Sequence, residues 1–279
     1  MKKIFFSLIF FVPFTLSTFA QEIQLLDSTK WLCQYDYNLL EDSTNRNSAK
    51  NTAMVLQIGS HLSKFCTSTS LTGDSIHYYN QDVDLNTYTQ LFSKAMYMAK
   101  PGSLLAMYVI YKNYPTPGSM FFTAYGDHIF YKLEQPLKMV WELDNQQDSV
   151  ILGFNCQKAR TSYAGRNYTA WYAPQIPVSE GPYKFNGLPG LILKICDTKN
   201  EHCFTLTSMK QVNYFQPIFI SKNDYVDITP KEYNKMMKNK LISLLGTLQG
   251  GGTVTFNNEE DKARAMKGLK IKNNFIEKF

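Results

Sequence analysis

The sequence predicts a mainly β protein with a few helices (α+β), built as a curved antiparallel sheet or partial barrel with a covering helix. Short apolar or alternating segments follow one another, separated by Gly- and Pro-containing turns, as in all-β architectures. Aromatic residues make up 14% of the 279 residues, which is high for a single domain; most are expected in the core and on sheet faces, and a surplus is available to line an apolar cavity. Clear helical patterns are confined to two segments.

The first twenty residues have the pattern of a secretory signal peptide. Lys2 and Lys3 precede an apolar segment, Ile4 to Leu16, and Thr18-Phe19-Ala20 supplies a cleavage site before Gln21. The apolar segment is too short for an ordinary membrane span. We therefore expect an exported protein that does not span a membrane, located in the periplasm, outside the cell or at the outer membrane. No Gly/Ser/Pro linker divides residues 21–279, so we expect one domain.

The first half of the chain is predicted to form mainly strands. Trp31 to Tyr37 alternates, which places Trp31, Cys33, Tyr35 and Tyr37 on one face. Met54 to Ile58 and Leu62 to Cys66 flank Gly59-Ser60-His61 as a hairpin would. Asp84 to Met98 carries a helical apolar stripe. Further strands are expected at Ser103 to Tyr111, Met120 to Tyr125, Ile129 to Leu133 and Lys138 to Leu143.

The second half predicts three strands and the covering helix. The strands are Arg166 to Ala173, Leu191 to Ile195 and Phe204 to Val212. Thr229 is a natural helix N-cap, Pro230 suits the first position and Glu232 completes a capping box. Gly246 is expected to close this helix. Its apolar stripe is Tyr233, Met236, Met237, Leu241, Leu244 and Leu245.

Five cysteines follow the leader, and an exported chain is expected to form at least one disulfide. Cys196 and Cys203 flank a polar hairpin loop between apolar strands, so they are the first predicted pair. Cys33 with Cys66 is a second candidate pair. Cys156 would then be the odd thiol.

Two interpretations fit the loop from Ile176 to Phe185. In the first, the loop belongs to a buried strand–turn–strand whose prolines and glycines are purely geometric, because turn chemistry explains each of them. In the second, the rigid loop and its neighbours present a binding surface. The candidate binding residues are Arg166, Trp171, Glu180, Tyr183, Lys184 and Phe185.

Residues Gly187, Leu188, Pro189, Gly190, Leu191 and Ile192 spell GLPGLI. Similar blocks occur at Met54 to Gly59 with Ser63 to Phe65, Ile151 to Ala159, Gly165 to Tyr172, Ile176 to Phe185 and Asn274 to Glu277. Together these blocks resemble the GLPGLI family of secreted bacterial proteins. The resemblance implies an exported β-rich envelope protein of unassigned activity and supplies no catalytic residues. After Cys156 the chain departs from the family pattern: Arg160-Thr161-Ser162 stands where relatives place a second cysteine.

No catalytic constellation, cofactor motif or metal site stands out. A metal at Cys196, His202 and Cys203 is less favoured than a disulfide, and a thiol nucleophile at Cys156 less favoured than a buried inert thiol. The formal net charge of +6, without a Lys/Arg block, argues against nucleic acid as a partner. We expect a non-enzymatic accessory protein that docks an outer-membrane or periplasmic partner through the loop. The alternative is a periplasmic carrier of an apolar ligand, and the third hypothesis is a thiol or hydrolytic enzyme.

Overall fold

The structure of the chain, a computed structural model, describes residues 22–98, 102, 104–126, 129–249, 259, 260, 263 and 274–278. The predicted signal peptide lies outside these residues and stays a prediction. Within the described ranges, no helix combines the length and the apolar character that crossing a membrane would need.

Strands dominate the described part of the chain. They are β1 (Ile23–Ser28), β2 (Trp31–Leu40), β3 (Ala49–Ile58), β4 (Ser63–Thr67), β5 (Val109–Lys112), β6 (Ser119–Gly126), β7 (Ile129–Pro136), β8 (Glu142–Ile151), β9 (Phe154–Tyr163), β10 (Arg166–Ala173), β11 (Leu191–Asp197), β12 (His202–Gln211), β13 (Pro217–Ser221) and β14 (Tyr225–Asp227). The helices are α1 (Ser68–Tyr79), α2 (Leu85–Met98) and α3 (Pro230–Gln249), with 3-10 turns at Arg46–Ser48 and Leu104–Ala106.

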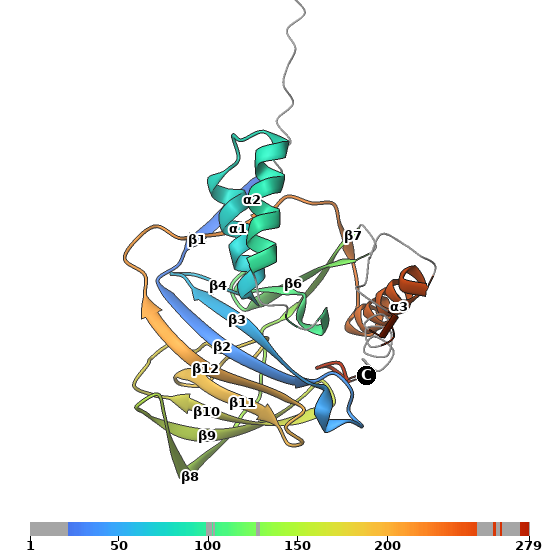
Figure 1. Cartoon of the computed structure of the whole chain (residues 1–279). Helices are drawn as coiled ribbons and strands as arrows, with labels where there is room; N and C mark the ends of the chain where they lie inside the picture. The colour runs from blue at the N-terminus through green and yellow to red at the C-terminus, as the bar shows by residue number, and fades with distance from the viewer. Residues whose placement is uncertain are drawn as a thin grey trace, which may run out of the picture.

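Twelve of these strands form one sheet in the order β14-β7-β6-β5-β4-β3-β2-β12-β11-β10-β9-β8. Neighbours are antiparallel except β14 and β7, which are parallel. β1 and β13 form a separate antiparallel ribbon. The large sheet is open and bends, so that β8 to β12 with β2 and β3 form one wall and β6 and β7 turn away from it (Figure 1). The predicted α+β fold with a curved, largely antiparallel sheet is confirmed.

The alternation predicted for β2 is confirmed. Cys33, Tyr35 and Tyr37 are almost fully buried, and Trp31 is half-buried against the same core. The hairpin of β3 and β4 is also confirmed, because the Gly59 amide donates to the Leu62 carbonyl at 2.9 Å.

Two predicted strands have different bounds in the structure. The segment predicted from Ser103 forms a 3-10 turn at Leu104–Ala106, and its strand is only Val109–Lys112. The strand predicted from Lys138 begins at Glu142 instead. Leu105, Ala106 and Tyr108 are buried, and Met139 and Trp141 pack against the core, without belonging to a strand, which composition alone does not reveal.

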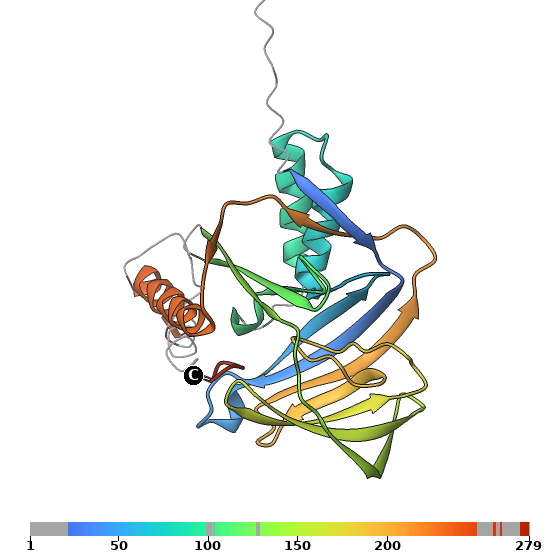
Figure 2. The same cartoon turned by 180° about the vertical axis from the view of Figure 1, so that it is seen from behind.

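The structure contains a helical hairpin, of which only the second helix was predicted. α1 begins after Thr67, whose side chain accepts a hydrogen bond from the Ser70 amide at 3.0 Å. Its sequence, STSLTGDSIHYY, has no buried residue and hardly any apolar stripe, so periodicity gave no signal. The hairpin of α1 and α2 stands at one end of the sheet, away from α3 (Figure 2).

The covering helix α3 has the predicted capping box. The Thr229 amide donates to Glu232 Oε2 at 2.8 Å, and the Glu232 amide donates to Thr229 Oγ1 at 3.2 Å. Met236, Met237 and Tyr233 pack against residues of β6 and β7. The prediction that Gly246 ends the helix is wrong, because α3 continues to Gln249. A single helical glycine costs only about 1 kcal/mol.

Candidate functional site

The segment between β10 and β11, residues 174–190, is called the signature loop here. Its first part turns back on the end of β10, since the Ile176 amide donates to the Ala173 carbonyl at 3.1 Å. Amides of Val178 and Glu180 then donate to carbonyls two residues earlier, at 2.7 and 2.8 Å. Residues 174–179 form the exposed half of the loop. Its exposed side chains are those of Pro174, Gln175, Pro177 and Ser179.

Residues 180–188 form the buried half of the loop. Tyr183 has a positive φ of 54° and lies in a turn closed by the Phe185 amide and the Pro182 carbonyl at 3.1 Å. The Tyr183 ring stacks on Phe204 of β12 at 6.3 Å, and the Phe185 ring meets Tyr168 of β10 edge-on at 4.7 Å. The buried half therefore fills the hollow of the bent sheet with its own side chains.

A buried ion pair anchors the start of this half. Lys112, at the end of β5, is 0% exposed, and its Nζ lies 2.5 Å from Glu180 Oε2. The same ammonium donates to the Gly181 carbonyl at 2.6 Å. Charges are taken out of water only when they are paired and hydrogen-bonded. Lys112 thus fixes the junction between the exposed and buried halves.

A second buried ion pair anchors the middle of the loop. Lys184 Nζ lies 2.7 Å from Glu277 Oε1, and the Tyr183 hydroxyl donates to the same oxygen at 2.8 Å. Burial lowers the pKa of Lys184, although the Glu277 carboxylate opposes that shift. Burial, followed by the charge of Glu277, raises the pKa of Tyr183 well above its usual value.

Arg166, the first residue of β10, joins the polar end of β11 and β12 to residues 274 and 275. Its Nη1 contacts Asp197 at 2.5 Å and Glu201 at 2.8 Å, and both carboxylates are buried. Burial alone would raise the pKa of Glu201, but hydrogen bonding to Arg166 and the nearby Lys278 make the net shift downward. Arg166 is therefore an internal connector rather than an exposed charge.

Trp171 differs from the other candidates because it is only half-buried, although it still packs against the core. It pairs in register with Lys158 of β9 and Lys194 of β11. The Lys194 ammonium lies 5.6 Å from the centre of the indole ring, within cation–π range.

The GLPGLI residues form the last turn of the loop and the start of β11. Leu188, Leu191 and Ile192 are buried, and the Tyr35 hydroxyl donates to the Ile192 carbonyl at 2.7 Å. A Cβ atom at Gly190 would collide with the Ala173 carbonyl, so only glycine fits this close approach. Packing and close backbone approach thus explain Leu188, Gly190, Leu191 and Ile192.

The structure brings five of the six candidate binding residues together inside the protein. Arg166, Glu180, Tyr183, Lys184 and Phe185 are at most 9% exposed. Sequence patterns did not identify their partners Lys112 and Glu277 as buried residues, because a lone Lys or Glu is usually exposed to solvent. A lysine at the end of an apolar strand, Val109–Lys112, was the available signal.

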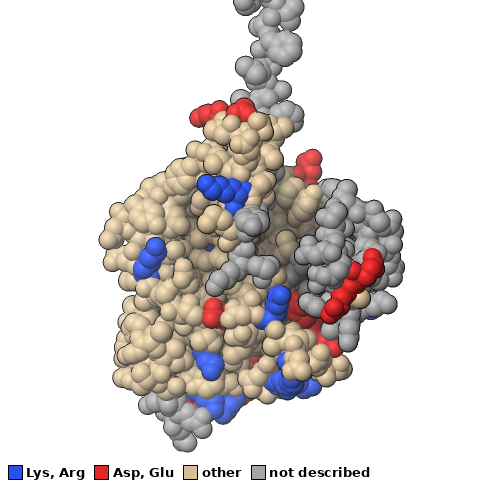
Figure 3. Space-filling model, in the orientation of Figure 1, with Lys and Arg blue, Asp and Glu red and all other residues tan. Residues whose placement is uncertain are grey.

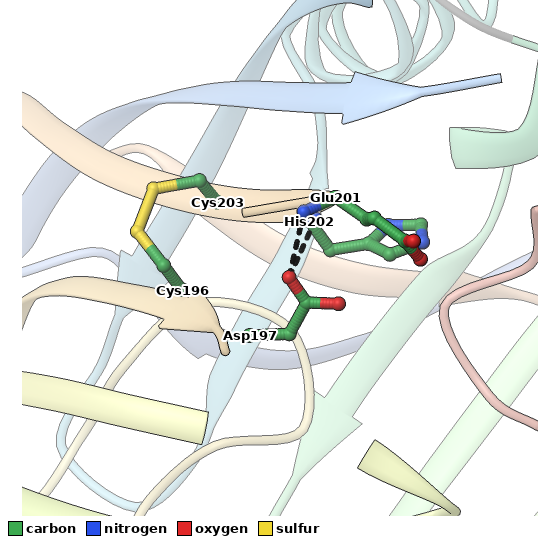
Figure 4. Close-up of a disulfide and its surroundings, with 5 residues drawn as sticks. All are labelled: Cys196, Asp197, Glu201, His202 and Cys203. Carbon is green, nitrogen blue, oxygen red and sulfur yellow. Dashed lines mark hydrogen bonds between the residues drawn. A yellow bond between two sulfur atoms is a disulfide. The ribbon is translucent and has the colours of Figure 1, made fainter. Parts of the chain in front are cut away.

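The five cysteines form one disulfide and leave three free thiols. Cys196 and Cys203 are opposite each other in β11 and β12 and are bonded, as predicted (Figure 4). In the same hairpin the Asp197 carboxylate accepts from the amides of Glu201 and His202, at 2.7 and 3.3 Å. The predicted Cys33–Cys66 bond is wrong, since both are free and buried. They lie on β2 and β4, which are separated by β3.

The three thiols are poor nucleophiles. Burial raises the pKa of Cys33 and of Cys66 to about 12, and burial also raises the pKa of Cys156. Reactive cysteines need the opposite shift, which stabilises the thiolate. These thiols are therefore protonated at neutral pH.

A hollow of about 310 Å³ adjoins the exposed half of the loop. Its wall is shared by the β3–β4 turn, the start of β2 and the loop residues Pro177, Val178 and Glu180. On the face shown in Figure 3, the Lys and Arg side chains of the described residues are scattered rather than gathered into one patch.

Comparisons with known proteins give little functional information. Residues 162–194, which comprise the end of β9, β10, the signature loop and the start of β11, match a family model described as "Protein of unknown function (Porph_ging)". No curated protein matches. Solved structures of PNGF-II in two crystal forms are similar at 15% identity, with TM-scores of 0.45 and 0.46, over 75% of this chain. The chain covers only about a third of the PNGF-II chain (33% and 32%).

Proposed function

We propose that this chain is a non-enzymatic binding protein of the exported GLPGLI type, which docks a periplasmic or outer-membrane protein through the exposed half of the signature loop. One observation carries the proposal. The exposed half, residues 174–179, lies beside a hollow and is held at both ends by buried contacts. A rigid surface loses little conformational entropy when a partner binds.

The buried candidate residues have an indirect role in this proposal. Glu180 is anchored by Lys112, and Lys184 by Glu277, so the loop cannot swing away from the sheet. Ser179 Oγ also donates to the Leu188 carbonyl at 2.6 Å, which ties the exposed half to the GLPGLI turn. Substitutions at Tyr183 or Lys184 would therefore act on the anchoring of the loop and would not test docking by themselves.

Photo-crosslinking in the native host tests the proposal. A crosslinking residue replaces the exposed Gln175, and the matched control replaces Gln211, an exposed glutamine at the end of β12. We expect one discrete crosslinked protein from position 175 and none from 211. That protein, once purified, should bind the full chain, and Gln175→Trp should weaken binding at least tenfold while Gln211→Trp should not. Equal crosslinking at both positions, or unchanged affinity of Gln175→Trp, contradicts the proposal.

The carrier hypothesis has less support in the described residues. A carrier needs an apolar pocket of roughly 300–1,000 Å³ that encloses most of its ligand. The hollow of about 310 Å³ beside the loop and another of about 610 Å³, lined by Tyr114, Lys132 and Lys222 among others, are open to solvent and about as polar as apolar, and the more enclosed space between the sheet and α3 is about 10 Å³. Native mass spectrometry of protein purified gently from its envelope distinguishes the hypotheses, because a retained small molecule would favour the carrier.

Export itself remains part of the proposal. A disulfide is expected in an oxidising compartment. N-terminal sequencing of protein recovered from the cell envelope should begin at Gln21. A chain that still begins at Met1 would contradict export through this leader.

A further inference from the structure

Residues 274–278, here called the closing segment, lie in a groove as a bound peptide would. Its contacts come from the end of β2, the β9–β10 turn, the signature loop and α3, and the surface that these elements present to it is called the groove. The segment has no regular structure and takes its hydrogen bonds from other elements. The Asn274 amide donates to the Glu41 carbonyl at 3.2 Å, and the Lys278 amide donates to the Ala164 carbonyl at 2.8 Å. Figure 1 shows the segment near the ends of β2 and α3.

One end of the groove recognises an asparagine. Its side-chain oxygen accepts from Arg166 Nη2 at 2.6 Å, and its amide nitrogen donates to the Leu40 carbonyl at 2.9 Å. Arg166 Nη2 also donates to the Phe275 carbonyl at 2.9 Å. Arg166 is buried, and its Nε has no hydrogen-bond partner among the described residues.

The other end recognises a carboxylate. Three donors converge on Glu277 Oε1: Lys184 Nζ at 2.7 Å, Tyr183 at 2.8 Å and Tyr163 at 3.2 Å. Asn234 of α3 donates to the Glu277 carbonyl at 2.9 Å, and Tyr168 to the Ile276 carbonyl at 3.3 Å. Charge-assisted bonds of this kind are strong and select a carboxylate over an amide.

We propose that this groove is a binding site for a short peptide of the type Asn-aromatic-aliphatic-Glu, and that the closing segment is its resident ligand. A partner peptide with the same chemistry takes its place. This site lies apart from the exposed half of the signature loop, so either proposal can fail alone. The intact chain is its own competitor, because a tethered ligand has an effective concentration in the mM range.

The test weakens the resident ligand and leaves the groove intact. The host is the full chain carrying Asn274→Ala and Glu277→Gln. The probe is a fluorescent synthetic peptide with the sequence of residues 272–278, and anisotropy reports its binding. We expect saturable binding to the variant and at least tenfold weaker binding to the wild-type chain. A probe with Gln in place of Glu should bind at least tenfold more weakly than the Glu probe.

Two further variants test whether Lys184 is the group that recognises the carboxylate of the probe. Lys184→Met in the same host should abolish the preference for the Glu probe over the Gln probe. Lys210→Met, which removes an exposed charge on β12, should leave that preference unchanged. A folded host that binds neither probe, or binds both equally, overturns the proposal.

A second host protein tests the proposal if the double variant does not fold. A protease site inserted between Ala263 and Asn274 of the otherwise native chain is cut after folding. The cleaved segment should stay bound and then exchange with excess Glu probe, as size-exclusion chromatography measures. Retention without exchange overturns the proposal.

Discussion

At Lys112 an ammonium group lies in a position with no solvent exposure, and one carboxylate balances its charge. Such a pair stabilises little relative to an apolar pair of the same shape, but removal of one partner leaves a buried charge unpaired. The main effect of the ion pair is therefore to fix the position of the signature loop relative to β5.

We predict that Lys112→Met lowers the free energy of unfolding by about 3–5 kcal/mol, because Glu180 is left buried without its cation. Adding Glu180→Gln should recover part of the loss, since no charge then remains unpaired. Urea denaturation measures the free energy of unfolding of the single and the double variant. Lys210→Met, at an exposed position, should change stability by less than about 0.5 kcal/mol. A loss below about 1 kcal/mol for Lys112→Met would show that the pair is solvated.

The buried tyrosines set a limit on stability in alkali. Burial raises the pKa of Tyr35, Tyr37, Tyr108 and Tyr183 well above the ordinary value of 10.0. Above pH 10 the unfolded chain releases these protons while the folded chain keeps them, so stability falls as the pH rises.

We predict cooperative alkaline unfolding beginning near pH 10, with tyrosinate absorbance and circular dichroism changing together. Tyr183→Phe should reduce the slope of unfolding free energy against pH by about one proton. Tyr79→Phe, which removes an exposed hydroxyl, is the matched control. Tyrosinate absorbance that rises fully before the structure is lost would contradict this interpretation.

Among the elements, β10 was predicted to the residue because its alternation is regular. α1 was missed because tertiary contacts, not an apolar stripe, hold it. For the signature loop the sequence left two interpretations open, a buried strand–turn–strand and an exposed binding surface. Its burial depends on Lys112 and Glu277, which are distant in sequence and only meet it in the fold. Local patterns thus predicted strands and caps but not the long-range ion pairs of the candidate site.

The β11–β12 hairpin gives a prediction at this scale. Replacing Cys196 and Cys203 together by serine should lower the free energy of unfolding by about 2–3 kcal/mol, because the bond closes a short loop in the unfolded chain. Chemical denaturation measures the loss. Thiol titration of the denatured native protein should find the three thiols Cys33, Cys66 and Cys156. A single thiol would instead indicate a second disulfide.

At the scale of the whole molecule, the signature loop connects parts that are far apart in the sheet. Its buried half contacts β5 through Lys112, β10 and β12 through its aromatic rings, and the closing segment through Lys184. The single domain expected from the sequence would follow from these shared contacts.

We predict one unfolding transition for residues 21–279, with tryptophan fluorescence and circular dichroism coincident. Arg166→Ala, which leaves Asp197 and Glu201 buried without their cation, should shift both signals to lower urea together. Two separated transitions would divide the chain into independently folding parts.

The open sheet also affects whether copies of this protein can associate through their outer strands. Its two outer strands expose main-chain groups that can recruit further strands and start aggregation. One of them, β14, is only 3 residues long and ends in Asp227. The other, β8, begins with Glu142 and loses its register between Asp144 and Asp148. A short strand, acidic side chains and an irregular ladder all discourage strand addition. Both outer strands thus carry features that oppose edge-to-edge polymerisation.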